Sequence, residues 1–341
     1  MSYPYKLSVI VPCYNAEKYL AMCLDSLERQ WEDEFFEIIF VNDCSTDSTI
    51  DLLRDFCTRH PSNTRLIDKS QNEGVGQARN DALAIAQGEW ITFLDADDAL
   101  VDGAYECLAK HFFSDDFDII SFRTIIIHED IMHSKEKHPV SFNNTSDDMI
   151  EWEGTGKDFY INYLTNVCWI FCYKHQLIDK YNVRFKRMSY LEDLIFNIDV
   201  FLHDDVRVRR VKCQLHYWRT DHTESLSYIS SSNRKRNGRM AEDLINGIGY
   251  LQKKKMNLDN QEIANRIERK LNDECGIVVP LLLRCNLKIS RYMRIIKQLK
   301  EWNIYPYKGA KDKKSLFYNT LYHVPILIYA FRPLYRLGIT V

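Results

Sequence analysis

Hydrophobic positions in the first hundred residues fall into short runs separated by longer amphipathic segments. The runs at 7–11, 37–42, 64–67 and 90–94 are rich in β-branched and aromatic residues, which is typical of buried strands. Between these runs, apolar residues recur at helical spacing. Four strand–loop–helix units of this length predict an α/β fold with a Rossmann-like, mostly parallel sheet and flanking helices.

The chain beyond residue 100 alternates less regularly and becomes helical towards its end. Polar residues dominate 128–158, where we expect a loop or an insertion. The other elements expected here are helices at about 102–113, 189–203, 240–254, 261–284 and 290–302, apolar stretches at 118–127 and 160–173, and a strand at 206–218.

Polar side chains follow each of the first four predicted strands. They are Tyr14 and Asn15 after the first strand, Asp43, Ser45 and Asp47 after the second, Asn72 and Gly74 after the third, and Asp95 and Asp97 after the fourth. Ligands of parallel α/β sheets bind at the carboxyl ends of the strands. One polar strand end is ordinary, whereas four at the same edge indicate a binding site.

The fourth strand end is the strongest candidate for chemistry. Asp95 and Asp97 can lean the same way because side chains alternate along extended chain, and Ala96 leaves room between them. Paired carboxylates form a hard-oxygen site of the kind that holds Mg²⁺ or Mn²⁺ together with phosphates. The alternative is a polar turn, which is the more common meaning of an isolated pair. Helix capping is the simplest account of Asp98.

Two phosphate-binding motifs are absent from the chain. No G-x-G-x-x-G follows the first strand, which argues against a dinucleotide enzyme, and no G-x-x-x-x-G-K-[ST] is present, which argues against a P-loop NTPase. A pyrophosphate would therefore be neutralised by other means, and a metal ion held by carboxylates is the natural candidate.

Composition points to a globular protein of a reducing compartment. The 341 residues are 45% hydrophobic and 27% charged. The ten cysteines lack zinc-like pairing, and Cys168 and Cys172 lie in an apolar stretch as expected of buried thiols. The first six residues contain no signal-peptide core, and no run of about 18 apolar residues predicts a membrane span. We therefore expect a cytoplasmic protein and no nucleic-acid partner.

Charge is distributed unevenly along the chain. Residues 284–341 carry 12 lysines and arginines against Glu301 and Asp312, although the whole chain has a net charge of −3. The end of this segment is aromatic and aliphatic, and it is interrupted by Pro325 and Pro333. This pattern favours a basic tail that meets an anionic membrane surface. A solvated basic helix and a segment packed back on the core are the alternatives.

Four motifs together resemble the family-2 inverting glycosyltransferases of the GT-A fold. The motifs are Val9–Glu17, Val41–Thr49, Asn72–Asn80 and Phe93–Asp98, and the resemblance covers roughly residues 5–228. It implies transfer of a sugar from a nucleotide-diphosphate donor. It also implies a GT-A domain at 1–230, with a donor-binding half at about 1–100 and an acceptor half at about 101–230. Residues 231–341 would form a helical C-terminal extension.

The resemblance implies roles for the donor-site residues. Pro12, Tyr14 and Glu17 would frame the base and the ribose, and Asp43 would accept a hydrogen bond from the uracil N–H, which suggests a UDP-sugar. Arg79 would reach the nucleotide. The other residues implied in donor binding are Asn15, Ser45, Asp47, Asn72, Gly74, Asp95, Ala96, Arg219 and Ser225. Two departures from the family pattern are Asn42, where a second Asp is frequent, and Cys44, where a Gly is common.

The resemblance also implies the catalytic and metal-binding residues. Asp193 would be the base that accepts the proton of the acceptor hydroxyl, with Glu192 beside it, although capping of a helix start is an alternative. Asp97 would bind Mn²⁺ or Mg²⁺ directly, and Asp95 would be shared between the metal and the ribose. His222 is a further metal ligand, a phosphate donor or an ordinary loop histidine. Trp169 is an apolar wall for the acceptor sugar or a core residue.

The predicted function is single-sugar addition. The Q-x-x-R-W motif and membrane helices of processive family members are absent. We expect transfer from a UDP-sugar to a glycan acceptor, lipid-linked at the inner membrane face, as in capsule or O-antigen assembly. A sugar nucleotidyltransferase would need a glycine- and lysine-rich loop near the N-terminus, which residues 12–17 lack. A non-catalytic binding protein is the other alternative, and the combination of Asp95, Asp97 and Asp193 argues against it.

Overall fold

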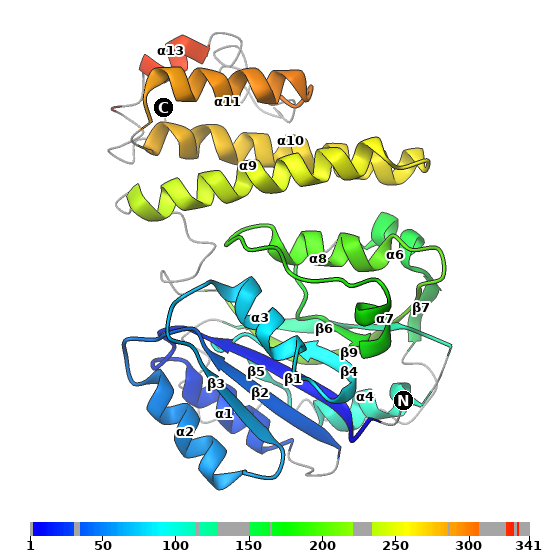
Figure 1. Cartoon of the computed structure of the whole chain (residues 1–341). Coiled ribbons are helices and arrows are strands. Elements are labelled where there is room, and N and C mark those ends of the chain that lie inside the picture. The colour runs from blue at the N-terminus through cyan, green and yellow to red at the C-terminus, as the bar shows by residue number, and fades with distance from the viewer. Residues whose placement is uncertain are drawn as a thin grey trace. The chain divides into compact units, whose positions relative to one another are not determined.

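A computed structural model describes the chain in nine parts: residues 3–30, 35–113, 116–127, 150–163, 166–220, 234–285, 287–306, 325–330 and residue 333. The chain divides into two compact units (Figure 1). Met1–Arg187 and Glu192–Thr223 form the sheet unit, and Met188–Leu191 and Glu224–Val341 form the helical unit. The boundary predicted at residue 230 lies outside the described residues and stays a prediction.

The sheet unit is built on one mixed sheet. Its strand order is β3-β2-β1-β4-β8-β6-β9-β5, and β7 pairs with β9. The strands are β1 (Tyr5–Cys13), β2 (Phe36–Asn42), β3 (Thr64–Asp68), β4 (Gly88–Phe93), β5 (Ala99–Leu100), β6 (Ile119–Ile127), β7 (Ile150–Thr155), β8 (Phe171–Lys174) and β9 (Arg207–Arg219). The first four strands are mutually parallel, and β6 is parallel to β9. The mostly parallel α/β fold is therefore confirmed.

Helices cover the sheet and account for its continuous apolar strands. Residues 7–13 of β1 and all of β2 are buried, as expected when both faces of a parallel sheet are covered. The helices of this unit are α1 (Leu20–Glu28), α2 (Thr49–Arg59), α3 (Val75–Leu83), α4 (Ala104–Phe112), α6 (Gly156–Asn162), α7 (His175–Lys180) and α8 (Glu192–Phe201).

The order of the first four strands locates the binding edge. Strands β2 and β3 lie on one side of β1, and β4 lies on its other side. Strand order therefore reverses between β1 and β4, and ligands of such sheets bind beyond the carboxyl ends of the strands at this point. The loops that begin at Tyr14 and Leu94 lie at these strand ends, since Ile10 pairs with Phe93 across the two strands.

The polar stretch 128–158 is more ordered at its end than predicted. Residues 128–149 lie outside the described residues, but β7 and the start of α6 occupy positions 150–158. The expectation of a loop was wrong for 150–158, because β7 is held by its pairing with the distant strand β9. Two ion pairs also join these strands: Glu153 lies 2.7 Å from Arg209, and Glu151 lies 2.9 Å from Arg210. The alternation of Ile150 and Trp152 with Glu151 and Glu153 covers only four positions, which is too short to stand out in a polar stretch.

The helical unit contains α9 (Arg234–Met256), α10 (Gln261–Arg284), α11 (Ile289–Glu301) and α13 (Pro325–Ala330). The first three match the predicted C-terminal helices. Helices α9 and α10 run side by side, with Leu244, Ile248, Ile267 and Leu271 fully buried (Figure 1). Asn260 caps α10 by accepting hydrogen bonds from two backbone N–H groups. Within the described parts of the chain, no helix is both long enough and apolar enough to span a bilayer.

Candidate active site

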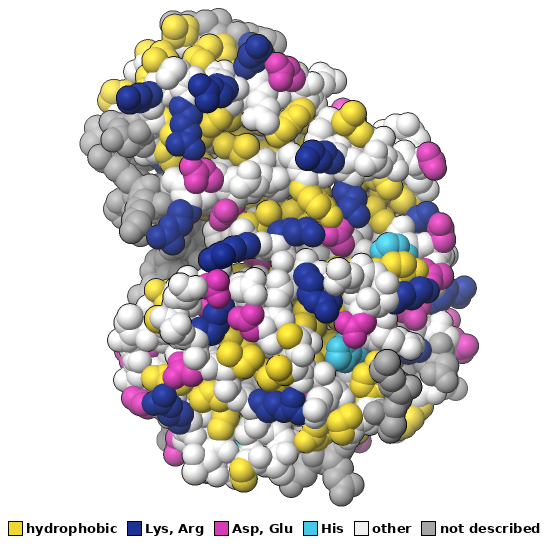
Figure 2. Space-filling view, in the orientation of Figure 1, with side chains coloured by type: hydrophobic (Ala, Val, Ile, Leu, Met, Phe, Trp, Pro, Cys, Tyr) yellow, Lys and Arg dark blue, Asp and Glu magenta, His cyan; other side chains and the backbone are white. Residues whose placement is uncertain are grey.

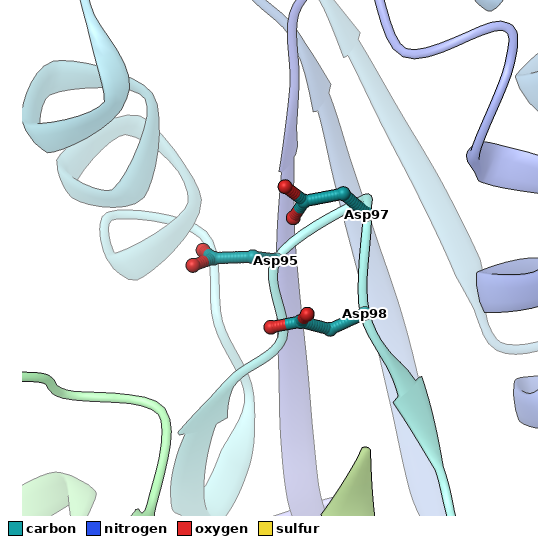
Figure 3. A group of neighbouring side chains, drawn as sticks. All are labelled: Asp95, Asp97 and Asp98. Atoms are coloured by element: carbon teal, nitrogen blue, oxygen red, sulfur yellow. The ribbon is translucent and has the colours of Figure 1, made fainter. Parts of the chain in front are cut away.

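Three carboxylates gather on the loop after β4. Ligand atoms of Asp95, Asp97 and Asp98 lie within 4.8 Å of one another, and the side chains extend to the same side of the loop (Figure 3). Ala96 between them is buried, as expected of a small spacer. Carboxylate oxygens at such spacing suit a hard divalent cation. The described part of the chain thus carries an acidic cluster at the predicted place.

Asp98 has a different role from the helix cap that the sequence suggested. The short strand β5 follows it, not a helix, so there is no helix start to cap. One carboxylate oxygen accepts a hydrogen bond from the Arg219 N–H at 3.0 Å, and the other lies 3.3 Å from Nε2 of His216. Burial raises the pKa of this carboxyl, and His216 beside it opposes the rise. Asp98 therefore ties the acidic loop to β9.

Arg79 is the most densely paired side chain of the site. Its guanidinium lies 2.8 Å from Asp95 and 2.5 Å from Asp193, and Glu192 lies 3.7 Å away. It is 2% exposed and rests over the ring of Phe185. One buried cation thereby joins the acidic cluster to the start of α8. The contact with the nucleotide that the sequence suggested for Arg79 stays a prediction.

Three carboxylates share this single guanidinium, and two of them hold their protons unusually tightly. Burial and the neighbouring Asp193 raise the pKa of Glu192 to about 8, and Arg79 opposes the rise. Burial raises the pKa of Asp95 to about 6, although Arg79 lowers it. A single positive charge cannot compensate three buried negative charges. The neutral, protonated forms of Glu192 and Asp95 are therefore favoured up to a higher pH than usual.

The raised pKa of Glu192 predicts a pH-dependent effect of Glu192→Gln. The stabilising effect of its bound proton is fully present below about pH 4.5 and is lost as the pH rises through about 8. Glutamine stays neutral, so the variant should melt about 4 °C above the wild type at pH 9 and within about 1 °C of it at pH 4.5. Thermal melting curves across this range test the prediction, and a difference that is independent of pH would contradict it.

Glu192 and Asp193 open α8, where the helix dipole favours acidic side chains. Capping alone does not describe Asp193, because its carboxylate points into the network around Arg79. Its second oxygen accepts a hydrogen bond from the Cys168 N–H at 3.2 Å. The side chain keeps 13% of its surface exposed, which leaves a path for a proton from outside. The predicted role of Asp193 as a base is consistent with this position and stays a prediction.

The buried carboxylate of Asp43 organises the third loop. It accepts hydrogen bonds from the N–H groups of Glu73 at 3.0 Å and Gly74 at 2.7 Å, and Lys69 lies 3.2 Å away. Gly74 has φ of +92°, a conformation that favours glycine at this helix start. Asn72 donates to the carbonyl of Asp43 at 3.1 Å. The loop and the strand end therefore form one unit, and the contact of Asp43 with uracil stays a prediction.

The loops after β1 and β2 are tied to each other. Asn15 N–H donates to Ser45 Oγ at 3.0 Å, and Glu17 N–H donates to Asp47 at 3.2 Å. Asp47 also accepts from the N–H of Thr49 at the start of α2. Tyr14 is 52% exposed beside this junction, whereas Pro12 lies inside β1. An exposed ring on a braced loop is available to stack on a base.

The end of β9 closes the site on its other side. Arg219 donates from Nε to the Asp97 carbonyl at 3.2 Å and lies over the ring of Tyr19. Trp169 is buried and stacks on His216 with ring centroids 4.5 Å apart. This favours the core alternative for Trp169. His222 and Ser225 lie outside the described residues, so their predicted roles stay predictions.

Two residues of the site were absent from the sequence predictions. Lys69 directly follows β3, so the rule that polar residues at strand ends form the site could have found it. His216 lies within β9 and reaches Asp98 across 118 positions of chain, and nothing in its local sequence indicates that partner.

A family model and several curated proteins are similar to this chain. Residues 8–181 match the model of Glycosyl transferase family 2, which confirms the resemblance drawn from the four motifs. An Escherichia coli glycosyltransferase, YibD, is 28% identical over 67% of this chain. The poly(ribitol-phosphate) beta-glucosyltransferase of Bacillus spizizenii is 44% identical over 27% of this chain. These matches span 65% and 15% of the length of the two relatives.

Solved structures support the fold over nearly the whole chain. S. aureus TarS 1–349 in complex with UDP-GlcNAc superposes with a TM-score of 0.60 at 20% identity, covering 98% of this chain and 92% of that one. The mannosyltransferase PcManGT of Pyrobaculum calidifontis, in complex with GDP-Man and Mn²⁺, has a TM-score of 0.52 at 14% identity, covering 99% and 88%. At this identity the likeness concerns the fold.

Proposed function

The chain belongs to glycosyltransferase family 2, and on this basis we propose that it transfers one sugar from a UDP-sugar to a hydroxyl acceptor, with inversion and with a divalent metal ion. The observation that carries the proposal is the Arg79 network. It joins Asp95 of the acidic cluster to Asp193 through contacts of 2.8 and 2.5 Å. A donor phosphate bound at the cluster and an acceptor near Asp193 would then meet across one buried cation.

The acidic cluster has the donor set that a metal ion requires. Asp97 and Asp95 would hold Mn²⁺ or Mg²⁺, because Asp98 already contacts His216 and the Arg219 N–H. All the candidate ligand atoms are carboxylate oxygens, which hard divalent cations prefer. When bound there, the metal would neutralise charge on the departing pyrophosphate. The solved relative from P. calidifontis contains Mn²⁺ together with its nucleotide sugar.

Asp193 supplies the base in this mechanism. Its carboxylate takes the proton from the acceptor hydroxyl as that oxygen bonds to the anomeric carbon of the sugar. The bond from this carbon to the diphosphate breaks on the opposite face, the electron pair leaves with UDP, and the configuration inverts. Arg79 donates a hydrogen bond to one oxygen of Asp193 at 2.5 Å. The Cys168 N–H holds the other oxygen and fixes the carboxylate plane.

The donor is proposed to be a UDP-sugar because of Asp43 and Tyr14. Asp43 lies at the carboxyl end of β2, and Tyr14 exposes its ring at the end of β1. The experiment is a screen of UDP-, GDP- and dTDP-sugars with Mn²⁺, scored by nucleotide release. We expect release from one or more UDP-sugars to exceed release from the others at least about tenfold, as expected when a buried polar group selects one base. A preference for GDP-sugars would overturn the assignment.

The acceptor is proposed to be a glycan or polyol-phosphate chain carried on a lipid. Two curated relatives, from Bacillus spizizenii and Staphylococcus aureus, are named as poly(ribitol-phosphate) glycosyltransferases. Basic side chains lie among hydrophobic ones over the helical unit in the view of Figure 2. On α11, Ile289 and Met293 are exposed, and its Arg and Lys residues add positive charge. This composition suits an anionic lipid surface.

Membrane binding through the basic segment has a direct test. The full chain should float with liposomes that contain anionic lipid, and replacing Lys308, Lys311 and Lys314 with Gln should reduce the bound fraction at least about threefold. Replacing Lys253, Lys254 and Lys255 of α9 with Gln removes the same charge elsewhere and serves as the control. Equal flotation of the two triple variants would contradict a role for the 308–314 segment.

A further inference from the structure

Met188–Leu191, which come just before Glu192 and the proposed base Asp193, belong to the helical unit. Ser189 donates from both its N–H and its hydroxyl to one carboxylate oxygen of Asp243 in α9, at 2.9 and 2.6 Å. Glu274 is fully buried in α10 and pairs with Lys270 at 2.5 Å, and the Tyr190 hydroxyl opposes the rise in the pKa of Glu274 that burial causes. Residues 188–191 are thereby joined to two helices through buried and partly buried polar groups.

Leu191 completes this attachment and does so in a strained conformation. Its φ is +69°, which is unfavourable for a residue with a branched side chain. Its side chain is buried against Gly247 of α9, where an added Cβ would lie only 2.8 Å from Leu191 Cδ1. A glycine at position 247 therefore makes room for Leu191. Strain of this kind persists only where surrounding contacts impose it.

The segments on either side of 188–191 are held by the sheet unit. Phe185 exchanges two hydrogen bonds of 2.9 Å with the side chain of Asn80 in α3. Arg187 lies 3.3 Å from Glu73. Immediately after Leu191, Glu192 and Asp193 join the Arg79 network. The chain thus leaves the sheet unit for four residues only, directly before the side chain proposed as the base.

We propose that Asp243, Gly247 and Glu274 are positioning residues, through which the helical unit fixes residues 188–191 and so sets the placement of Asp193. The effect on catalysis rests on the proposed function. The anchoring of residues 188–191 is independent of that function, because the contacts hold the start of α8 whatever role Asp193 has. A displacement of about 1 Å at a reacting group lowers turnover by up to about 100-fold, so a remote anchor can control the rate.

Asp243→Ala tests the proposal in the full chain. It removes the acceptor for both bonds of Ser189, and we expect kcat for UDP release from the UDP-sugar chosen in the donor screen, with Mn²⁺, to fall about tenfold, with KM changed less than about twofold. Asp243→Asn keeps an acceptor oxygen and should restore kcat to within about threefold of the wild type. Glu242→Gln is the control. Glu242 lies next to Asp243 in α9, but its side chain is exposed and pairs with Arg291 of α11.

A second pair of variants separates positioning from general damage to α9. Gly247→Val pushes Leu191 away, whereas Gly249→Val meets Trp302 instead. Gly247→Val should lower kcat and speed amide exchange in residues 188–201, whereas Gly249→Val should do neither. Asp243→Ala should also speed amide exchange in residues 188–201.

The outcomes distinguish anchoring from catalysis. If amide exchange in Asp243→Ala is no faster than in Glu242→Gln, the anchoring is overturned, even if Asp193 proves not to be the base. Faster exchange with unchanged kcat would overturn the positioning role. Undiminished transfer by Asp193→Asn would instead refute the proposed function and leave the anchoring result standing.

Discussion

Asp193→Asn is expected to lower kcat for sugar transfer about 10³-fold, because the amide cannot accept the proton of the acceptor hydroxyl. The replacement has nearly the same shape and keeps one oxygen for either the Arg79 guanidinium or the Cys168 N–H. We therefore expect the melting temperature to change little and donor binding to persist. Transfer is measured as radiolabelled sugar incorporated into product, and binding as calorimetric titration with UDP.

The matched control for this variant is Asp199→Asn. Asp199 lies in the same helix and faces Lys186 at 3.7 Å, away from the Arg79 network. It should keep transfer within about threefold of the wild type, because its ion pair with Lys186 does not include Arg79, Asp95 or Asp193. Near-wild-type transfer by Asp193→Asn would remove Asp193 from the role of base. Equal losses in the two variants would attribute the effect to α8 as a whole.

Arg79→Met should cause the largest loss of stability among single substitutions in the site. It leaves the carboxylates of Asp95, Asp193 and Glu192 without their shared cation, and breaking a buried pair costs about 3–5 kcal/mol. The loss should grow as the pH rises, because Glu192 and Asp95 lose their protons near pH 8 and pH 6. Urea unfolding at pH 5.5 and pH 8.5 measures the difference.

Arg54→Met is the control for Arg79→Met. Arg54 pairs with Asp68 at 3.0 Å on the surface and keeps 59% of its side chain exposed. Its loss should cost less than about 1 kcal/mol at either pH, as is usual for exposed ion pairs. A cost for Arg79→Met that is as small, or that shrinks as the pH rises, would contradict the account of the buried network.

The binding edge at the carboxyl ends of the first four strands could be predicted from local patterns in the sequence. Strands β1, β2 and β4 are short, largely buried runs, and they end in loops whose polar residues, such as Asp43 and Asp95, lie at the same edge. That inference needs only the geometry of parallel strands and the rule for their carboxyl ends. The match of residues 8–181 to the family model covers this same region.

The partners of the charged residues did not follow from the sequence. Arg79 and Asp193 are 114 positions apart, and His216 and Asp98 are similarly distant, so no local pattern links them. The sequence suggested a nucleotide contact for Arg79, and it gave no sign of the three carboxylates that pair with Arg79 in the folded chain. Likewise, β7 escaped prediction because its apolar alternation is only four residues long and its partner strand β9 lies far along the chain.

The stereochemistry of transfer tests the central claim most directly. The sugar of UDP-GlcNAc is linked in the α configuration, and a base on the face opposite UDP delivers the acceptor oxygen from the β face. For such an α-linked donor, proton NMR of the glycoside formed from the UDP-sugar chosen in the donor screen should show the β-linked product in the wild type. The same signal should be absent in Asp193→Asn. A product in the α configuration would mean retention and would contradict the assignment of Asp193 as the inverting base.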